Sequence, residues 1–158
     1  MESSQDVRSP DRCWEVVSVS RAKARLLDEV RAFGGDTLRD LHVFTDATYE
    51  TLYLRDDVRE QLADIDVPKY MDNERYGYVT RDTYEGLTYA EYRYTVRGFD
   101  QFEQFRTFVG ADRTVGLLAS FDQADSRDWL SLQESLDDVV AELGIDGLRP
   151  ETERVGEE

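Results

Sequence analysis

The run of residues 115–121, VGLLASF, constrains the fold more than any other stretch of this sequence. Its side chains are apolar or small in both alternating sets: Val115, Leu117, Ala119 and Phe121 on one face, and Gly116, Leu118 and Ser120 on the other. A strand of this kind is covered on both sides. We therefore expect residues 115–121 to form a strand in the middle of a sheet.

The segment that follows, residues 126–143, has the spacing of an amphipathic helix. Its apolar positions are Trp129, Leu132, Leu136, Val139, Val140 and Leu143. A stripe at this spacing predicts a helix whose apolar face packs on the sheet, and Gly144 is a natural place for it to end.

The remaining patterns predict the other elements of an α+β fold. We expect a helix over residues 20–33 with Ser20 as N-cap, strands at 41–44 and 49–55, a short helix from Asp56, and a strand over 88–97. The phenylalanines at 99, 102, 105 and 108 fit either a helix or a bulged strand, and we favour a strand at 104–109. Strands joined by short turns favour an antiparallel sheet of about five strands with helices packed on it.

Residues 70–94 form the least regular part of the predicted domain. They hold seven of the nine tyrosines, and residues 77–88 show no clear period, so we expect a surface excursion there. We expect three regions in the chain: a mobile polar leader at 1–18, a single α+β domain at 19–144, and a disordered acidic tail at 145–158.

The charge balance excludes several classes of partner. The chain has 35 acidic and 19 basic residues, a net charge of -16, and all of its basic residues except Lys23 and Lys69 are arginines. Such a chain repels nucleic acid and anionic membranes, and no apolar run is long enough to span a bilayer. Abundant carboxylates with almost no lysine resemble a halophilic archaeal protein, and we expect a cytoplasmic location.

No motif in the sequence predicts catalysis or a metal site. His42 is the only histidine, and no second histidine or neighbouring cysteine completes a zinc site. The pairs Asp56-Asp57 and Asp137-Asp138 lack the ligand pattern of a calcium loop. There is also no phosphate-binding loop, so we expect no catalytic, cofactor-binding or metal-ligating residue and a protein that is not an enzyme.

The tyrosine-rich segment supplies the candidate site residues. These are Tyr76, Tyr78, Arg81, Tyr84, Tyr92 and Arg93. Three interpretations stay open: a protein interface, because aromatic and arginine side chains are enriched at interface cores; a pocket for an aromatic or anionic ligand; or plain packing over the sheet.

Two resemblances bear on function. The helix at 26–35 followed by the 41–55 hairpin, and the strand at 115–121 followed by the helix at 126–143, resemble the element order of roadblock domains, a layout that PAS-like and profilin-like sheets share. The roadblock resemblance implies a non-enzymatic homodimer that acts as an adaptor or regulator for a small GTPase or other signalling protein; the alternative is a PAS-like small-molecule sensor with a Tyr-lined pocket. The phrases LRDDV at 54–58 and YGYVTRD at 76–82 are similar to an uncharacterised family of short haloarchaeal proteins.

Overall fold

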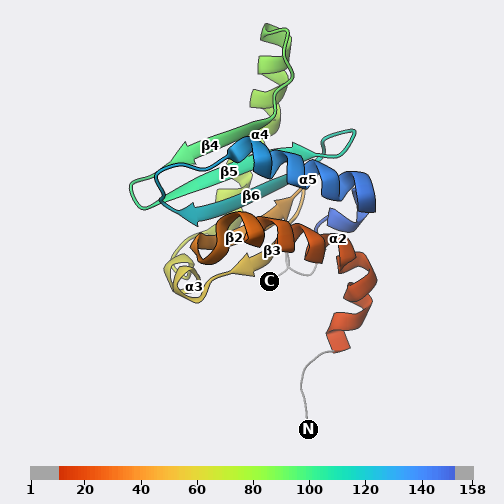
Figure 1. Ribbon diagram of the computed structural model, residues 1–158, viewed down its shortest axis with the longest axis vertical. Helices are drawn as coiled ribbons and strands as arrows, with labels where there is room; N and C mark the ends of the chain where they lie inside the picture. Colours follow the sequence, from red (N-terminus) through yellow and green to blue (C-terminus); the bar gives the residue numbers. More distant parts are fainter. Residues whose placement is uncertain (1–10, 152–158) are drawn as a thin grey trace.

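The computed structural model describes residues 11–151, and side chains from residue 21 onward. Five strands form one antiparallel sheet in the order β3-β2-β6-β5-β4 (Figure 1). The strands are β2 (Leu38–Phe44), β3 (Tyr49–Leu54), β4 (Tyr94–Gly98), β5 (Phe102–Val109) and β6 (Val115–Asp122). The helices are α2 (Asp11–Gly34), α3 (Asp56–Leu62), α4 (Val67–Leu87) and α5 (Trp129–Leu143), with short 3-10 turns at Gly35–Thr37 and Asp146–Leu148. The predicted α+β class with a five-stranded antiparallel sheet is confirmed.

Strand β6 lies at the centre of the sheet, as its two apolar faces predict. It pairs with β2 on one side and β5 on the other, and residues 115–121 are all buried. The strand predicted at 104–109 is also confirmed, as the main part of β5.

Helices α2 and α5 cover one face of the sheet (Figure 1). The core on this side joins Leu26 and Val30 of α2 to Leu117 of β6 and Leu132 of α5, all at most 1% exposed. Trp129 stacks on Phe105 with ring centroids 5.7 Å apart. Gly144 ends α5 with a φ of 87°, which a residue without a Cβ adopts at little cost.

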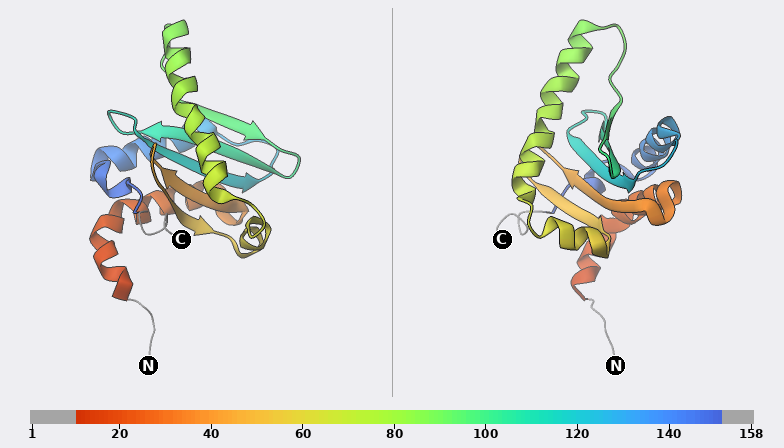
Figure 2. Two further views of the ribbon diagram at one scale, coloured as in Figure 1. Left: turned by 180° about the vertical axis from the view of Figure 1, so that it is seen from behind. Right: turned by 90° about the vertical axis from the view of Figure 1, so that its left-hand side faces the viewer.

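Helix α4 crosses the opposite face of the sheet (Figure 2, left). Its residue Met71 packs with Phe44, Phe108 and Leu118 in a second, smaller apolar cluster. The prediction of an irregular excursion is therefore wrong for residues 77–87, which are helical. The reason is that the buried positions of α4 are Met71, Glu74, Gly77 and Arg81, which have helical spacing but are mostly not hydrophobic.

Some predicted boundaries of helices, strands and the tail also differ from those of the structure. Helix α2 begins at Asp11, so Ser20 lies inside the helix and is not its N-cap. Strand β4 begins at Tyr94 and not near residue 88, and α5 is capped by Asp128, whose side chain accepts from the Ser131 N–H. Leu148, which was expected in a disordered tail, is 0% exposed. The remaining parts of the predicted leader and tail, residues 1–10 and 152–158, lie outside the described residues.

Between residues 11 and 151, no helix combines the length and apolar character needed to cross a membrane.

Candidate functional site

The C-terminal half of α4 projects past the sheet, and the chain returns alongside it to β4 (Figure 2, right). We call residues 76–93 the arm. Three apolar side chains on its helix are largely exposed: Tyr76 at 70%, Val79 at 64% and Leu87 at 76%. Since residues three, four and seven apart share one helix face, these side chains form a stripe with Thr80 and Thr83, flanked by the exposed Tyr84.

The arm is tied to the β5–β6 turn by charged groups. Arg113 donates to both carboxylate oxygens of Glu85 at 2.6 Å, and Arg81 donates to the backbone oxygen of Arg113 at 2.7 Å. Glu85 also accepts from the backbone N–H of Tyr92, on the returning chain, at 3.0 Å. These bonds fix the direction in which the arm projects.

The Glu85 carboxylate makes the arm's anchoring dependent on pH. Hydrogen bonds from Arg113 lower the pKa of Glu85 from 4.5 to about 2, against the opposing effect of its partial burial. Because the folded-state pKa is the lower one, the stabilisation is fully present above pH 4.5 and is lost as the pH falls through about 2. We expect urea unfolding to show a constant free-energy difference between wild type and Glu85→Gln above pH 4.5, and a shrinking one below it. A difference that grows on acidification would contradict this anchoring.

The candidate residues predicted from the sequence separate into two groups. Tyr78 and Arg81 point toward the sheet: the Tyr78 ring packs on Phe108 with centroids 4.5 Å apart, and the Arg81 guanidinium lies 5.0 Å from the same ring. Burial raises the pKa of Tyr78 to about 12. These two residues therefore hold α4 in place and do not present themselves to a partner.

The other candidates lie on the outer surface of the arm or beside it. Tyr84 contacts Tyr92 on the returning chain with ring centroids 5.8 Å apart, while Tyr76 and Arg93 are exposed. The arrangement makes an aromatic and apolar external surface at Tyr76 and Tyr84.

A buried ion cluster, missed by the sequence analysis, lies under the middle of α4. Glu74 is 0% exposed and accepts from Arg97 at 2.9 Å and from Arg106 at 3.4 Å. Gly77 permits this close approach, because a Cβ there would lie 2.6 Å from the Arg106 guanidinium carbon. The sequence signal was the spacing of Glu74, Gly77 and Arg81, which only a helix brings onto one face.

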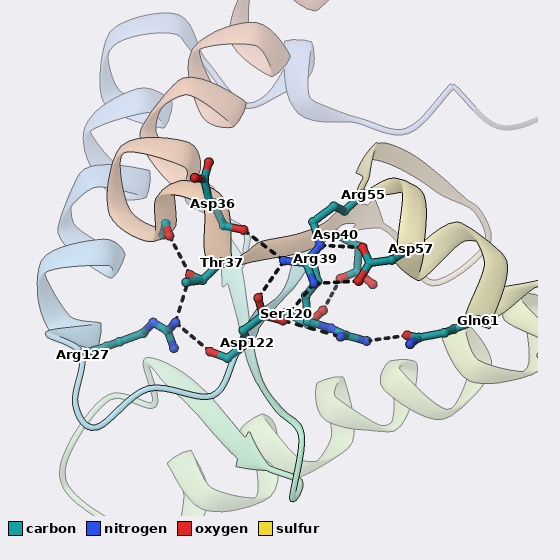
Figure 3. Close-up of polar contacts among 11 residues, drawn as sticks. Asp36, Thr37, Arg39, Asp40, Arg55, Asp57, Gln61, Ser120, Asp122 and Arg127 are labelled. Carbon is teal, nitrogen blue, oxygen red and sulfur yellow. Dashed lines mark hydrogen bonds and ion pairs between the residues drawn. The ribbon is translucent and has the colours of Figure 1, made fainter.

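At one end of the sheet, a polar network joins β2, β6 and α3 to Arg55, which lies between β3 and α3 (Figure 3). Arg55 binds both carboxylate oxygens of Asp122, at 2.8 and 2.9 Å, and also pairs with Asp57 at 2.6 Å. Arg127 donates to the Thr37 hydroxyl at 3.0 Å and to the Asp122 backbone oxygen at 2.8 Å. Asp57, one of the two adjacent aspartates Asp56-Asp57, therefore forms an ion pair with Arg55.

His42 lies beside this network, in the buried β2 strand. Its Nδ1 is 2.9 Å from the Thr51 hydroxyl, and its Nε2 is 3.6 Å from Asp40 Oδ2. Ser120 donates its proton to Asp40 at 2.8 Å and not to His42, so these residues lack the serine–histidine bond of an activated nucleophile. Within the described part of the chain, no group of three or more His, Cys, Asp or Glu residues could hold a metal ion.

Comparison with protein-family models places most of the chain in one family. A family model described as a domain of unknown function (DUF7522) matches residues 24–141. That range covers the sheet, α3 and α4, together with most of the described side chains of α2 and of α5. No curated protein matches the chain.

Proposed function

The chain belongs to the DUF7522 family of domains of unknown function, and we propose from its geometry that it is a non-enzymatic adaptor that acts through the arm. The observation that carries the proposal is the exposed stripe of Tyr76, Val79 and Leu87 on a helix that projects beyond the sheet. Exposed apolar groups gathered on one element are typical of protein-contact surfaces. Tyrosine in particular is enriched at the centres of interfaces.

We propose that the first partner of the arm is a second copy of the same chain. The stripe is self-complementary when two α4 helices pack antiparallel about a point between residues 81 and 82. Tyr76 then meets Leu87 of the other copy, Val79 meets Tyr84, and Thr80 meets Thr83. In a two-fold symmetric interface, each contact between one residue and a second residue of the other copy occurs twice with the roles reversed, and these pairs satisfy that rule. The small threonines at the centre of the interface allow the two helices to approach closely.

The resemblance to roadblock domains supports a role for such a dimer in signalling. In that role the dimer would present its surface to a small GTPase or another signalling protein in the cytoplasm. The excess of acidic over basic residues, with arginine in place of lysine, supports an origin in a halophilic archaeon, where molar salt screens the repulsion between two acidic copies.

Crosslinking tests the antiparallel arrangement. In a Cys13→Ser background, we expect Thr83→Cys to give a covalent dimer with a short bis-maleimide, because both copies of residue 83 lie near the two-fold axis. Ala141→Cys, on the exposed side of α5 at the opposite face of the sheet, is the matched control and should give no covalent dimer. Equal crosslinking of the two variants, or none of Thr83→Cys, would reject this interface.

A further inference from the structure

A small cavity lies between the polar end of the sheet and helices α3 and α4. Its volume is about 140 Å³, and its polar wall includes Arg39, Asp40 and Ser120, which Figure 3 shows together with Gln61. Tyr84, Tyr92 and Arg93 do not line it, so it is not the Tyr-lined pocket expected from the sequence. It is also separate from the stripe of the arm, so a ligand bound here does not require the proposed dimer.

Arg39 reaches this cavity because of a β-bulge. Leu38 pairs with Phe121 and Asp40 with Ser120, so Arg39 is an extra residue on β2 with no partner of its own on β6. Consecutive strand residues normally point to opposite faces, and a bulge redirects one of them. Arg39 and Asp40 therefore both line the same cavity.

The N–H donors of the Arg39 guanidinium are only partly used within the protein. Arg55 takes both oxygens of Asp122 at short distances, which leaves Arg39 3.8 Å from Asp122 Oδ1 and 3.4 Å from Gln61 Oε1. The guanidinium stacks on the Phe102 ring at 4.3 Å, and its buried Nε has no hydrogen-bond partner among the described residues. A buried unpaired donor is costly, and the long contacts of the two terminal nitrogens leave them able to donate to an anionic acceptor in the cavity.

Asp40 supplies the complementary charge. Burial alone would raise the pKa of Asp40, but His42, Ser120 and Arg39 together lower it, so the carboxyl is ionised near neutral pH. Ser120 donates to Oδ1, whereas His42 lies 3.6 Å from Oδ2, beyond hydrogen-bond distance. A carboxylate offers about four acceptor sites, so Asp40 can accept further bonds from a cationic donor.

The apolar part of the wall consists of Leu62, Ile65, Val67, Met71, Phe102 and Leu118. The polar side chains of His42, Gln61, Tyr70 and Gln104 also line the cavity. The volume is close to that of a cavity of about 150 Å³ that holds one benzene ring, so a branched aliphatic side chain fits. One cation, one anion and an apolar wall favour a small zwitterion with an aliphatic group.

We propose that this cavity binds a free α-amino acid with a branched aliphatic side chain, its carboxylate on Arg39 and its ammonium group on Asp40. Gln104 and Tyr70 complete the polar side: the Tyr70 hydroxyl accepts from Gln104 Nε2, which leaves its own proton to be donated. Because Tyr70 and Met71 belong to α4, the bound amino acid would contact the helix that continues into the arm.

Calorimetric titration with L-leucine in about 2 M KCl tests the proposal. We expect saturable binding, and at least about tenfold weaker binding of 4-methylpentanoate, which lacks the ammonium group, and of isoamylamine, which lacks the carboxylate. No saturable binding of leucine up to its solubility would overturn the proposal. Binding of either analogue as tight as leucine would overturn the two-point recognition.

Two variants locate the binding. Asp40→Asn keeps the shape of the side chain and should weaken leucine binding at least about tenfold. Ile65→Trp should abolish binding without unfolding the protein, because Ile65 is 43% exposed and lines the cavity. The matched control is Leu130→Trp, an equally exposed position on α5 at the opposite face, which should leave binding unchanged. Unchanged binding in Ile65→Trp would place the ligand elsewhere.

Discussion

Replacing Glu74 with alanine should lower the free energy of unfolding by about 3–5 kcal/mol, the usual cost of removing one partner from a buried ion pair. The Glu74 side chain is 0% exposed, and Arg106, 7% exposed, would keep its charge without a carboxylate beside it. The guanidinium Nε of Arg106 already lacks a partner, which makes the uncompensated charge more costly. Equilibrium unfolding in urea at high KCl, followed by circular dichroism, gives this difference.

Two further variants separate the charge from the packing. Glu74→Gln keeps the volume of the side chain and removes its charge, so most of the decrease in unfolding free energy expected for Glu74→Ala should remain. Glu74→Leu combined with Arg106→Met removes both buried charges and should be less destabilised than Glu74→Ala, because apolar pairs often replace buried ion pairs at little cost. A decrease of less than about 1 kcal/mol in the free energy of unfolding of Glu74→Ala would mean that the buried ion cluster does not stabilise the packing of α4 on the sheet.

Lowering the salt from about 2 M to about 0.05 M KCl should unfold or loosen the protein. The chain carries 35 acidic and 19 basic residues, and the Debye length rises from about 3 Å at 1 M salt to about 10 Å at 0.1 M. Repulsion among the carboxylates then extends across the surface and favours the expanded chain. The helical circular dichroism signal measures the transition.

Acidification provides the control for this interpretation. At low salt, moving the pH toward the isoelectric point near 4.4 should restore the folded signal, because the net charge approaches zero. The paired carboxylates of Asp122 and Glu85 stay ionised there, since arginine lowers the pKa of each. An unchanged spectrum from high to low salt at neutral pH would contradict both the repulsion and the proposed halophilic origin.

The central part of the fold was predictable because its residues carry simple periodic signals. Residues 115–121 are apolar on both faces, which is sufficient to place them inside a sheet, and Trp129, Leu132 and Leu136 mark one face of α5. In such segments burial and hydrophobicity coincide, so the pattern of apolar residues gives the element and its buried side.

The candidate site was only partly predictable because many of the side chains buried around it are polar. The face of α4 toward the sheet carries Glu74, Gly77 and Arg81, so the helix has no apolar period to reveal it. The cavity depends on the bulge that turns Arg39 to the side of Asp40, and nothing local in the sequence marks that bulge. Tyr76 and Tyr84 were identified as candidates, but only the helix shows that they belong to one exposed surface.

Light scattering at high KCl tests the central claim, self-association through the arm, most directly. We predict a mass twice that of the 18.3 kDa chain for the wild type, and the mass of one chain for Val79→Asp, which introduces a charge into the exposed stripe without touching the core. A single-chain mass for the wild type at all concentrations, or a dimer that Val79→Asp leaves intact, would contradict it.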